Sequence, residues 1–321
     1  MTKYKKYLRD CWDFSLSILP DSLFYSQGHC SNLAIWGSRR GGSSIFSELI
    51  FTAGSIREID QPFDSFRSDR LSFRCRRRLL LDKEMCQYFN LSNDEWAKIS
   101  AYLLRLTNGG HRSAYPMPLS FNRNARTVFK ILNAPFLADQ ITEALDLSSI
   151  YIMRHPISQA LSVMRNQWGL TYGPYVNSEW VRETFLNTSQ VKMVDSICHY
   201  GSTLEKYILN WVFENLFLLR DSEKMQLRVA YENLVVRPDL VAIQLDENLG
   251  LHVDVAVLAR PSRSRELSTN SKNRAIMRAD KSALVSSWMS EVSTAEIKCV
   301  QDILNVFEID TYIAHDPMPI L

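Results

Sequence analysis

Glycines, arginines and serines are concentrated in residues 37–44, which read Gly-Ser-Arg-Arg-Gly-Gly-Ser-Ser. Gly41 and Gly42 let a backbone close around an anion without a Cβ clash. The serine hydroxyls can donate hydrogen bonds, and the guanidinium of Arg40 can balance charge on a phosphate oxygen. These residue types predict a phosphate-binding loop. A tight turn between a strand and a helix is the alternative explanation of the glycines.

A second group of residues places an arginine and a serine eight positions apart, at Arg154 and Ser162, with Pro156 between them. An apolar run precedes the arginine, and a helical pattern contains the serine. Proline suits the first position of a helix, where its missing N–H costs nothing. Because open α/β sheets bind ligands at the carboxyl ends of their strands, we expect the guanidinium and the hydroxyl to hold a second phosphate there.

The two groups together resemble the cofactor signatures of the sulfotransferase family that uses 3′-phosphoadenosine 5′-phosphosulfate (PAPS). In that family a loop, commonly Lys/Arg-Ser-Gly-Thr-Thr, binds the 5′-phosphosulfate, and residues 40–44 match it except that Gly41 replaces the usual Ser. The family's Arg-x-Pro-x-x-x-x-x-Ser signature binds the 3′-phosphate, and Arg154, Pro156 and Ser162 reproduce it without a gap.

Two later segments extend the resemblance. Residues 231–234, Tyr-Glu-Asn-Leu, are similar to the family's Tyr-Glu-Asp-Leu segment near the adenine, and residues 260–265 are similar to its loop that closes over the 3′-phosphate. PAPS, and its product adenosine 3′,5′-bisphosphate (PAP), is therefore the implied cofactor, with no metal required. The implied cofactor-binding residues are Arg39, Arg40, Gly41, Gly42, Ser43, Ser44, Arg154, Ser162, Tyr231, Arg263 and Arg265.

Catalysis of sulfuryl transfer requires in-line positioning and stabilisation of charge on the leaving oxygen. The resemblance assigns the electrostatic task to Arg40. Lys130 is either a second catalytic cation or a solvated strand end. Residues 130–135 lack the His that cytosolic members carry in a Lys-Thr-His-Leu-Pro segment. His111 is the first candidate for the general base and Asp60 the second, and a surface or packing role is the alternative for both.

The elements that must position these residues alternate between short apolar runs and longer helical patterns, which predicts an α/β fold with a central parallel sheet flanked by helices. The resemblance implies a P-loop NTPase-like sulfotransferase fold in one domain, residues 1–321. A change in composition predicts a helical and loop insertion over 60–125 that contributes to the acceptor pocket. The expected strands are 32–36, 127–131, 149–153 and 226–230. The expected helices are 43–52, 94–106, 137–145, 157–167, 190–219 and 294–307.

Composition limits the classes of function. The 321 residues are 46% hydrophobic and carry a formal net charge of +2, so the chain lacks the global basicity of a non-specific nucleic-acid binder. Six scattered cysteines, with no signal peptide and no apolar run of spanning length, favour a cytoplasmic protein that has no membrane partner. The oligomeric state is left open, a homodimer included.

The acceptor implied by the resemblance is a small molecule with a hydroxyl or an amine, such as a natural product of secondary metabolism. Aromatic residues Trp168, Tyr172, Tyr175 and Trp180 are either pocket or core. The arginines within 74–78 either recruit an anionic substrate or form a solvated helix face. Two other functions remain: a P-loop-type small-molecule kinase, against which the missing Gly-Lys-Ser/Thr counts, and a non-catalytic nucleotide-binding module.

Overall fold

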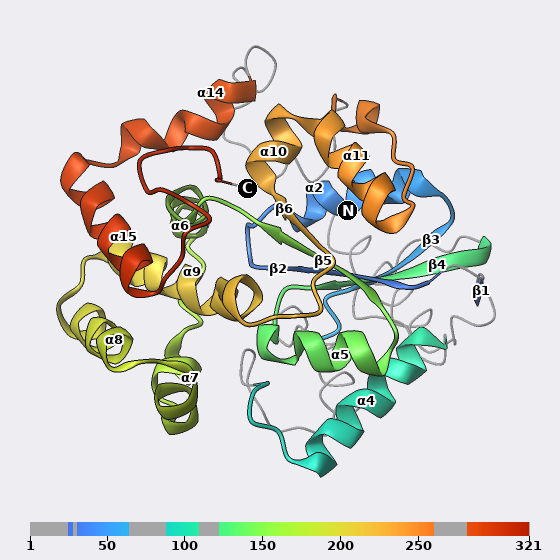
Figure 1. Cartoon of the computed structure of the whole chain (residues 1–321), viewed down its shortest axis with the longest axis horizontal. Coiled ribbons are helices and arrows are strands. Elements are labelled where there is room, and N and C mark those ends of the chain that lie inside the picture. The colour runs from blue at the N-terminus through green and yellow to red at the C-terminus, as the bar shows by residue number, and fades with distance from the viewer. Residues whose placement is uncertain (1–24, 28–30, 64–87, 109–121, 260–280, 321) are drawn as a thin grey trace, which may run out of the picture. The chain divides into compact units, whose positions relative to one another are not determined.

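The structure of the chain is a computed structural model that describes residues 25–27, 31–63, 88–108, 122–259 and 281–320 (Figure 1). Its strands form a sheet in the order β1-β4-β2-β5-β6, and β3 pairs with β4. The pairs β1–β4, β3–β4 and β5–β6 are parallel. The predicted α/β fold with a central parallel sheet flanked by helices is therefore confirmed.

The order of the elements brings each predicted phosphate motif to a junction between a strand and a helix. The strands are β1 (Tyr25–Gln27), β2 (Leu33–Gly37), β3 (Ile56–Asp60), β4 (Asn122–Ile131), β5 (Ser148–Met153) and β6 (Leu227–Ala230). The longer helices are α2 (Ser43–Ile50), α4 (Asn93–Thr107), α5 (Ala138–Ala144), α6 (Pro156–Arg165), α8 (Thr188–Tyr200), α9 (Thr203–Arg220), α11 (Pro238–Leu249) and α15 (Thr294–Val306). Shorter helical segments are η2 (Phe51–Ala53), η3 (Pro135–Leu137), α7 (Gly173–Val176), η4 (Val181–Phe185), α10 (Tyr231–Val236), η5 (Val255–Ala259), α14 (Lys281–Ser286) and η6 (Ser287–Glu291).

The described residues divide into two compact units, and the first contains those from 1–35 and 54–149. Here β4 is the shared strand, because β1 pairs with its first half and β3 with its second half. Ser92 caps helix α4: its hydroxyl accepts from the Glu95 N–H, while the Glu95 carboxylate accepts from the Ser92 N–H. Such a capping box satisfies two donors that the first turn leaves unpaired.

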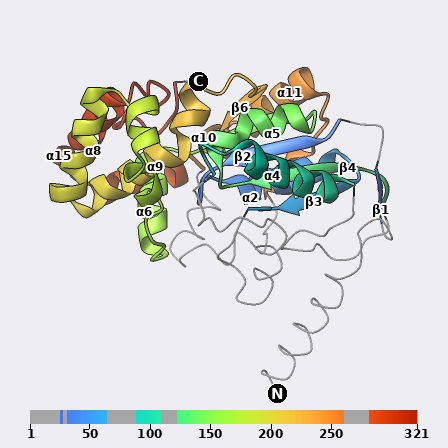
Figure 2. The same cartoon turned by 90° about the horizontal axis from the view of Figure 1, so that it is seen from below.

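The second unit contains the described residues from 36–53 and 150–321, and both phosphate motifs belong to it. Helix α9 is its central helix, packed against α6, α8 and α15 (Figure 2). Its apolar side chains, among them Trp211, Phe213 and Leu216, are almost fully buried. A helix that is buried on most of its faces belongs to a core. Polar side chains that α9 carries, such as Glu214, are therefore buried as well.

The four expected strands are confirmed within a few residues, whereas the single helix expected over 190–219 is wrong. Two helices, α8 and α9, occupy this stretch and are separated at Gly201 and Ser202. A Cβ on Gly201 would lie 2.6 Å from the Ile197 carbonyl oxygen. Ser202 forms a new capping box with Glu205. A glycine followed by a serine cap ends one helix and begins another, which apolar periodicity alone does not reveal.

Strand β3 was not expected from the sequence, and Asp60 is its last residue. The run Ile-Arg-Glu-Ile-Asp is too charged for the apolar strand pattern, and its pairing with β4 decides its conformation. The proposed insertion over 60–125 falls largely outside the described residues and stays a prediction. Within the described part of the chain, no helix is long and apolar enough to cross a membrane.

Candidate functional site

The first predicted phosphate loop is a tight turn between β2 and α2. The Gly41 N–H donates to the Ser38 carbonyl at 3.0 Å, and the Phe46 N–H closes the first helical turn onto Gly42. Gly42 has a φ of 102°, and a Cβ there would lie 2.6 Å from the ring of Tyr231. Both the conformation and the close approach therefore require glycine at this position.

The amino end of α2 follows this turn directly, with Ser43 buried and Ser44 exposed. Gly42, the residue that precedes the helix, offers no side-chain cap. The first N–H groups of a helix have no partner within it, and the helix dipole adds partial positive charge there. The backbone N–H groups and the serine hydroxyls are thus the kind of donors that an anion needs.

The second motif is the junction between β5 and α6. Pro156 is the first residue of α6, as expected. Arg154 precedes it, and its Nε and Nη2 donate to the Ser158 hydroxyl at 3.1 and 2.8 Å. The Arg154 guanidinium carbon also lies 4.5 Å from the ring centre of Tyr231. Cation–π contact and hydrogen bonds therefore fix the direction of this side chain.

The two motifs meet at Arg40. Its Nε donates to the Ser162 hydroxyl at 2.9 Å, and Arg154 Nη1 donates to the Arg40 carbonyl at 3.4 Å. Burial and the nearby charge of Arg154 lower the pKa of Arg40. Among the described residues neither arginine forms a salt bridge. Two partly buried cations that pair with no carboxylate in the described part of the chain make a site that favours a multiply charged anion.

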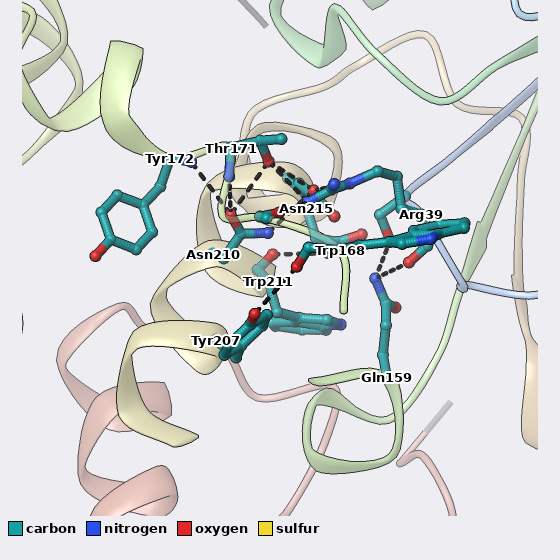
Figure 3. Close-up of polar contacts among 12 residues, drawn as sticks. Arg39, Gln159, Trp168, Thr171, Tyr172, Tyr207, Asn210, Trp211 and Asn215 are labelled. Carbon is teal, nitrogen blue, oxygen red and sulfur yellow. Dashed lines mark hydrogen bonds and ion pairs between the residues drawn. The ribbon is translucent and has the colours of Figure 1, made fainter. Parts of the chain in front are cut away.

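The buried side-chain amide of Gln159 connects the same two motifs. Gln159 on α6 donates from Nε2 to the Ser38 hydroxyl at 2.7 Å and to the Arg39 carbonyl at 2.8 Å (Figure 3). The Arg39 guanidinium is directed toward Glu214, with its Nε 2.9 Å from the carboxylate. Sequence reasoning missed Gln159 and Glu214. A polar residue inside an apolar helix pattern was the available signal for both.

Behind Arg154 lies a buried cluster that holds the end of β5. The His155 N–H and the Tyr312 hydroxyl both donate to the Glu232 carboxylate at 2.9 Å. The His155 ring stacks on Trp288, with 4.4 Å between ring centres. Burial lowers the pKa of His155 to about 3, and burial raises the pKa of Glu232. His155 is therefore a neutral packing residue.

Some predicted residues lie in the first unit. Lys130 forms an ion pair with Asp60 at 3.2 Å, and its side chain is only 7% exposed. The reading of Lys130 as a solvated strand end is therefore wrong. The second base candidate, Asp60, is the partner of that cation. His111, Arg263, Arg265 and the arginines within 74–78 lie outside the described residues.

The aromatic residues proposed for an acceptor pocket separate into two kinds. Tyr175 is buried and stacks on Phe213 with ring centres 5.6 Å apart, so it belongs to the core. Trp168 is 37% exposed, and the Arg40 guanidinium carbon lies 5.8 Å from its ring centre. Within the described residues no group of His, Cys, Asp and Glu has the arrangement of a metal site.

No protein-family model matches the chain, and neither does any curated protein. The sulfotransferase domain of the Synechococcus PCC 7002 olefin synthase is 17% identical with a TM-score of 0.43, over 90% of this chain and 98% of that chain. Mouse sulfotransferase SULT7A1 complexed with PAP is 12% identical with a TM-score of 0.42, over 90% and 87%. A sulfotransferase domain of the curacin biosynthetic pathway is 16% identical with a TM-score of 0.43, over 88% and 99%. The chain is thus similar in fold to these domains.

Proposed function

We propose that the chain is a sulfotransferase that moves the sulfuryl group of PAPS to a hydroxyl or amine of a small-molecule acceptor. The observation that carries the proposal is the meeting of Arg40 and Arg154 at two neighbouring strand ends. Arg154 donates to the Arg40 carbonyl, Arg40 donates to the Ser162 hydroxyl, and no carboxylate of the described residues forms a salt bridge with either arginine. A nucleotide with phosphate at both its 3′ and 5′ positions supplies anionic charge for both motifs. A natural product as acceptor and a cytoplasmic location belong to the same proposal.

Each residue then has a physical task. The amino end of α2, with Ser43 and Ser44, binds the 5′-phosphate, whereas Arg154 and Ser162 bind the 3′-phosphate. Arg40 stabilises the negative charge that develops on the leaving oxygen, and it acts electrostatically because arginine stays protonated. Lys130 remains a proposed second cation. His111 remains the proposed base, which accepts the proton of the acceptor hydroxyl or amine.

Thermal unfolding with and without nucleotide tests the proposal. A ligand that binds only the folded state stabilises it, by about 2.7 kcal/mol at a concentration of 100 times Kd. We expect PAP to raise the unfolding midpoint by several degrees without Mg²⁺. The Arg154→Ala protein is the control, because it should lose most of this shift.

Two results would contradict the proposal. One is the absence of a shift in the wild-type chain at millimolar PAP. The other is a shift with ATP and Mg²⁺ alone, which would instead support the small-molecule kinase.

A further inference from the structure

Two neighbouring arginines of the phosphate loop have opposite surroundings. Arg40 lies against Ser162 and Trp168 at the site, whereas Arg39 turns inward. The Arg39 Nε donates to Glu214 at 2.9 Å, and its Nη2 donates to the Gly169 carbonyl at 3.1 Å and to the Thr171 hydroxyl at 3.2 Å (Figure 3). The side chains of Arg39 and Glu214 are 14% and 6% exposed. The guanidinium of Arg39 thus donates its hydrogen bonds to other residues of the protein.

The partners of Arg39 belong to a larger network on α9. Glu214 Oε1 also accepts from the Thr171 hydroxyl at 2.8 Å and from Asn210 Nδ2 at 3.0 Å. The Asn210 side-chain oxygen in turn accepts from the backbone N–H groups of Thr171 and Tyr172 (Figure 3). Arg39 therefore connects the phosphate loop to α9 and to the segment 168–172. This segment carries Trp168, whose ring centre lies 5.8 Å from the guanidinium carbon of Arg40.

The backbone of Arg40 needs such support. Its φ of 64° lies in the left-handed region, which a residue with a Cβ occupies only when its surroundings impose it. Arg39, which precedes Arg40, is fixed at two points: its carbonyl accepts a hydrogen bond from Gln159, and its side chain donates one to Glu214. The Glu214 carboxylate is buried, and its Oε2 has no hydrogen-bond partner among the described residues. Because such burial is costly, it is typical of a functional constraint.

We infer that Arg39 and Glu214 are a positioning pair, which fixes the left-handed conformation of Arg40 and thereby the direction of its guanidinium, and that Arg39 itself does not contact the nucleotide. The inference rests on the proposed function, since it concerns the same nucleotide site. It replaces direct cofactor binding, the role expected for Arg39 from the sequence, with an indirect one.

The sign of one change in affinity distinguishes the two roles. Glu214→Gln removes a negative charge close to an anion site, so simple electrostatics predicts tighter PAP binding, and a freed Arg39 would add to it. A positioning pair predicts weaker binding, by 5-fold or more, because the loop loses its anchor. Isothermal titration calorimetry of the full chain with PAP measures the difference. Tighter or unchanged binding to the Glu214→Gln protein overturns the inference.

A second pair of variants separates positioning from general stability. In Arg39→Met/Glu214→Leu, apolar residues of similar volume replace the ion pair, an exchange that often leaves stability unchanged. Here, however, the unfolding midpoint should fall, because Thr171 and Asn210 lose their acceptor on Glu214. Below that midpoint, the folded variant should bind PAP at least 10-fold more weakly. Arg182→Met is the matched control, because it breaks another arginine–carboxylate pair, with Asp195, and should leave PAP affinity unchanged.

The single variant Arg39→Lys tests the inference if the double variant does not fold. Arg39→Lys keeps a charge toward Glu214 but lacks the fork that reaches Gly169 and Thr171, so it should bind PAP 3- to 10-fold more weakly. Affinity within twofold of the wild type in either variant overturns the positioning role and leaves the proposed function intact. Absence of PAP binding by the wild-type chain overturns both.

Discussion

At the scale of single residues, the site depends on backbone conformations that few side chains allow. Gly42 has a positive φ and also lies against Tyr231, so two separate restrictions act on one residue. Arg40 shares the left-handed region without being glycine. The loop is thus a place where local preference is overruled by tertiary contacts, as is common at functional sites.

We expect Gly42→Ala to destabilise the protein by about 2–4 kcal/mol, because it adds backbone strain and an overlap with the Tyr231 ring. Urea unfolding measures this change. Gly250→Ala is the matched control, since Gly250 has a φ of 59° but nothing within 4 Å of an added Cβ. The control should cost only the strain, about 1–2 kcal/mol. Equal losses in the two variants would show that the Tyr231 contact does not constrain the loop.

Arg40→Ala should weaken PAP binding about 10- to 100-fold, the value of a charge-assisted hydrogen bond. The unliganded variant should be at least as stable as the wild type, because the substitution removes a partly buried cation whose pKa is lowered by burial and by Arg154. Calorimetry and urea unfolding give the two quantities. Arg220→Ala, which removes an arginine paired with Asp221, should not alter the affinity. A less stable Arg40→Ala protein would contradict this account of the site's charge.

At the scale of elements, the sequence predicts where strands end better than where helices break. Strand β2 and strand β5 are apolar runs that stop at Gly37 and Arg154, and both were located from their residues. Once these strand ends were located, the positions of the two junctions that carry the phosphate motifs could be predicted as well. The break between α8 and α9 was missed because apolar residues continue with helical spacing on both sides of Gly201.

Gly201→Ala should destabilise the protein by about 1–3 kcal/mol, because the new Cβ would overlap the Ile197 carbonyl oxygen, a backbone atom that cannot move aside. Gly169→Ala is the control, with nothing within 4 Å of the added Cβ. It should be neutral or slightly stabilising, by up to about 1 kcal/mol, since alanine restricts the unfolded chain. Equal stabilities of the two variants in urea would refute the steric explanation of the helix break.

The interior of the site could be predicted only in part. Arg40, Arg154 and Ser162 were found because they stand at fixed spacings beside strands and helix starts. Gln159 and Glu214 act through contacts that span 120 and 175 positions, and no local pattern encodes these. The ion pair of Lys130 with Asp60 likewise depends on the register of β3 against β4.

At the scale of the whole molecule, protonation of a buried histidine connects pH to stability. The pKa of His155 is lowered to about 3 by burial, whereas an unfolded histidine titrates near 6.5. Below pH 6.5 the unfolded chain therefore binds a proton that the folded chain does not, so stability is lost as the pH falls from 6.5 toward 3. Burial raises the pKa of Glu232 from its ordinary value of 4.5, so this group acts with the opposite sign at pH values above 4.5.

We expect His155→Phe, which retains a ring against Trp288, to remove about 2 kcal/mol of the stability loss between pH 7 and pH 5. Urea unfolding of both proteins at both pH values isolates this contribution, because Glu232 is present in each. An unchanged pH dependence in His155→Phe would mean that His155 is not the group responsible.

The Tyr312 hydroxyl on the Glu232 carboxylate has a practical consequence for anyone who shortens the chain. Trimming back to Phe307, the residue that follows α15, deletes this tyrosine and leaves a buried acid with one donor fewer, beside a histidine that has lost one of its two ring neighbours. The damage would appear far from the cut, at the strand end that bears Arg154. Truncated or tagged versions of the chain should therefore retain Tyr312 and its hydrogen bond to Glu232.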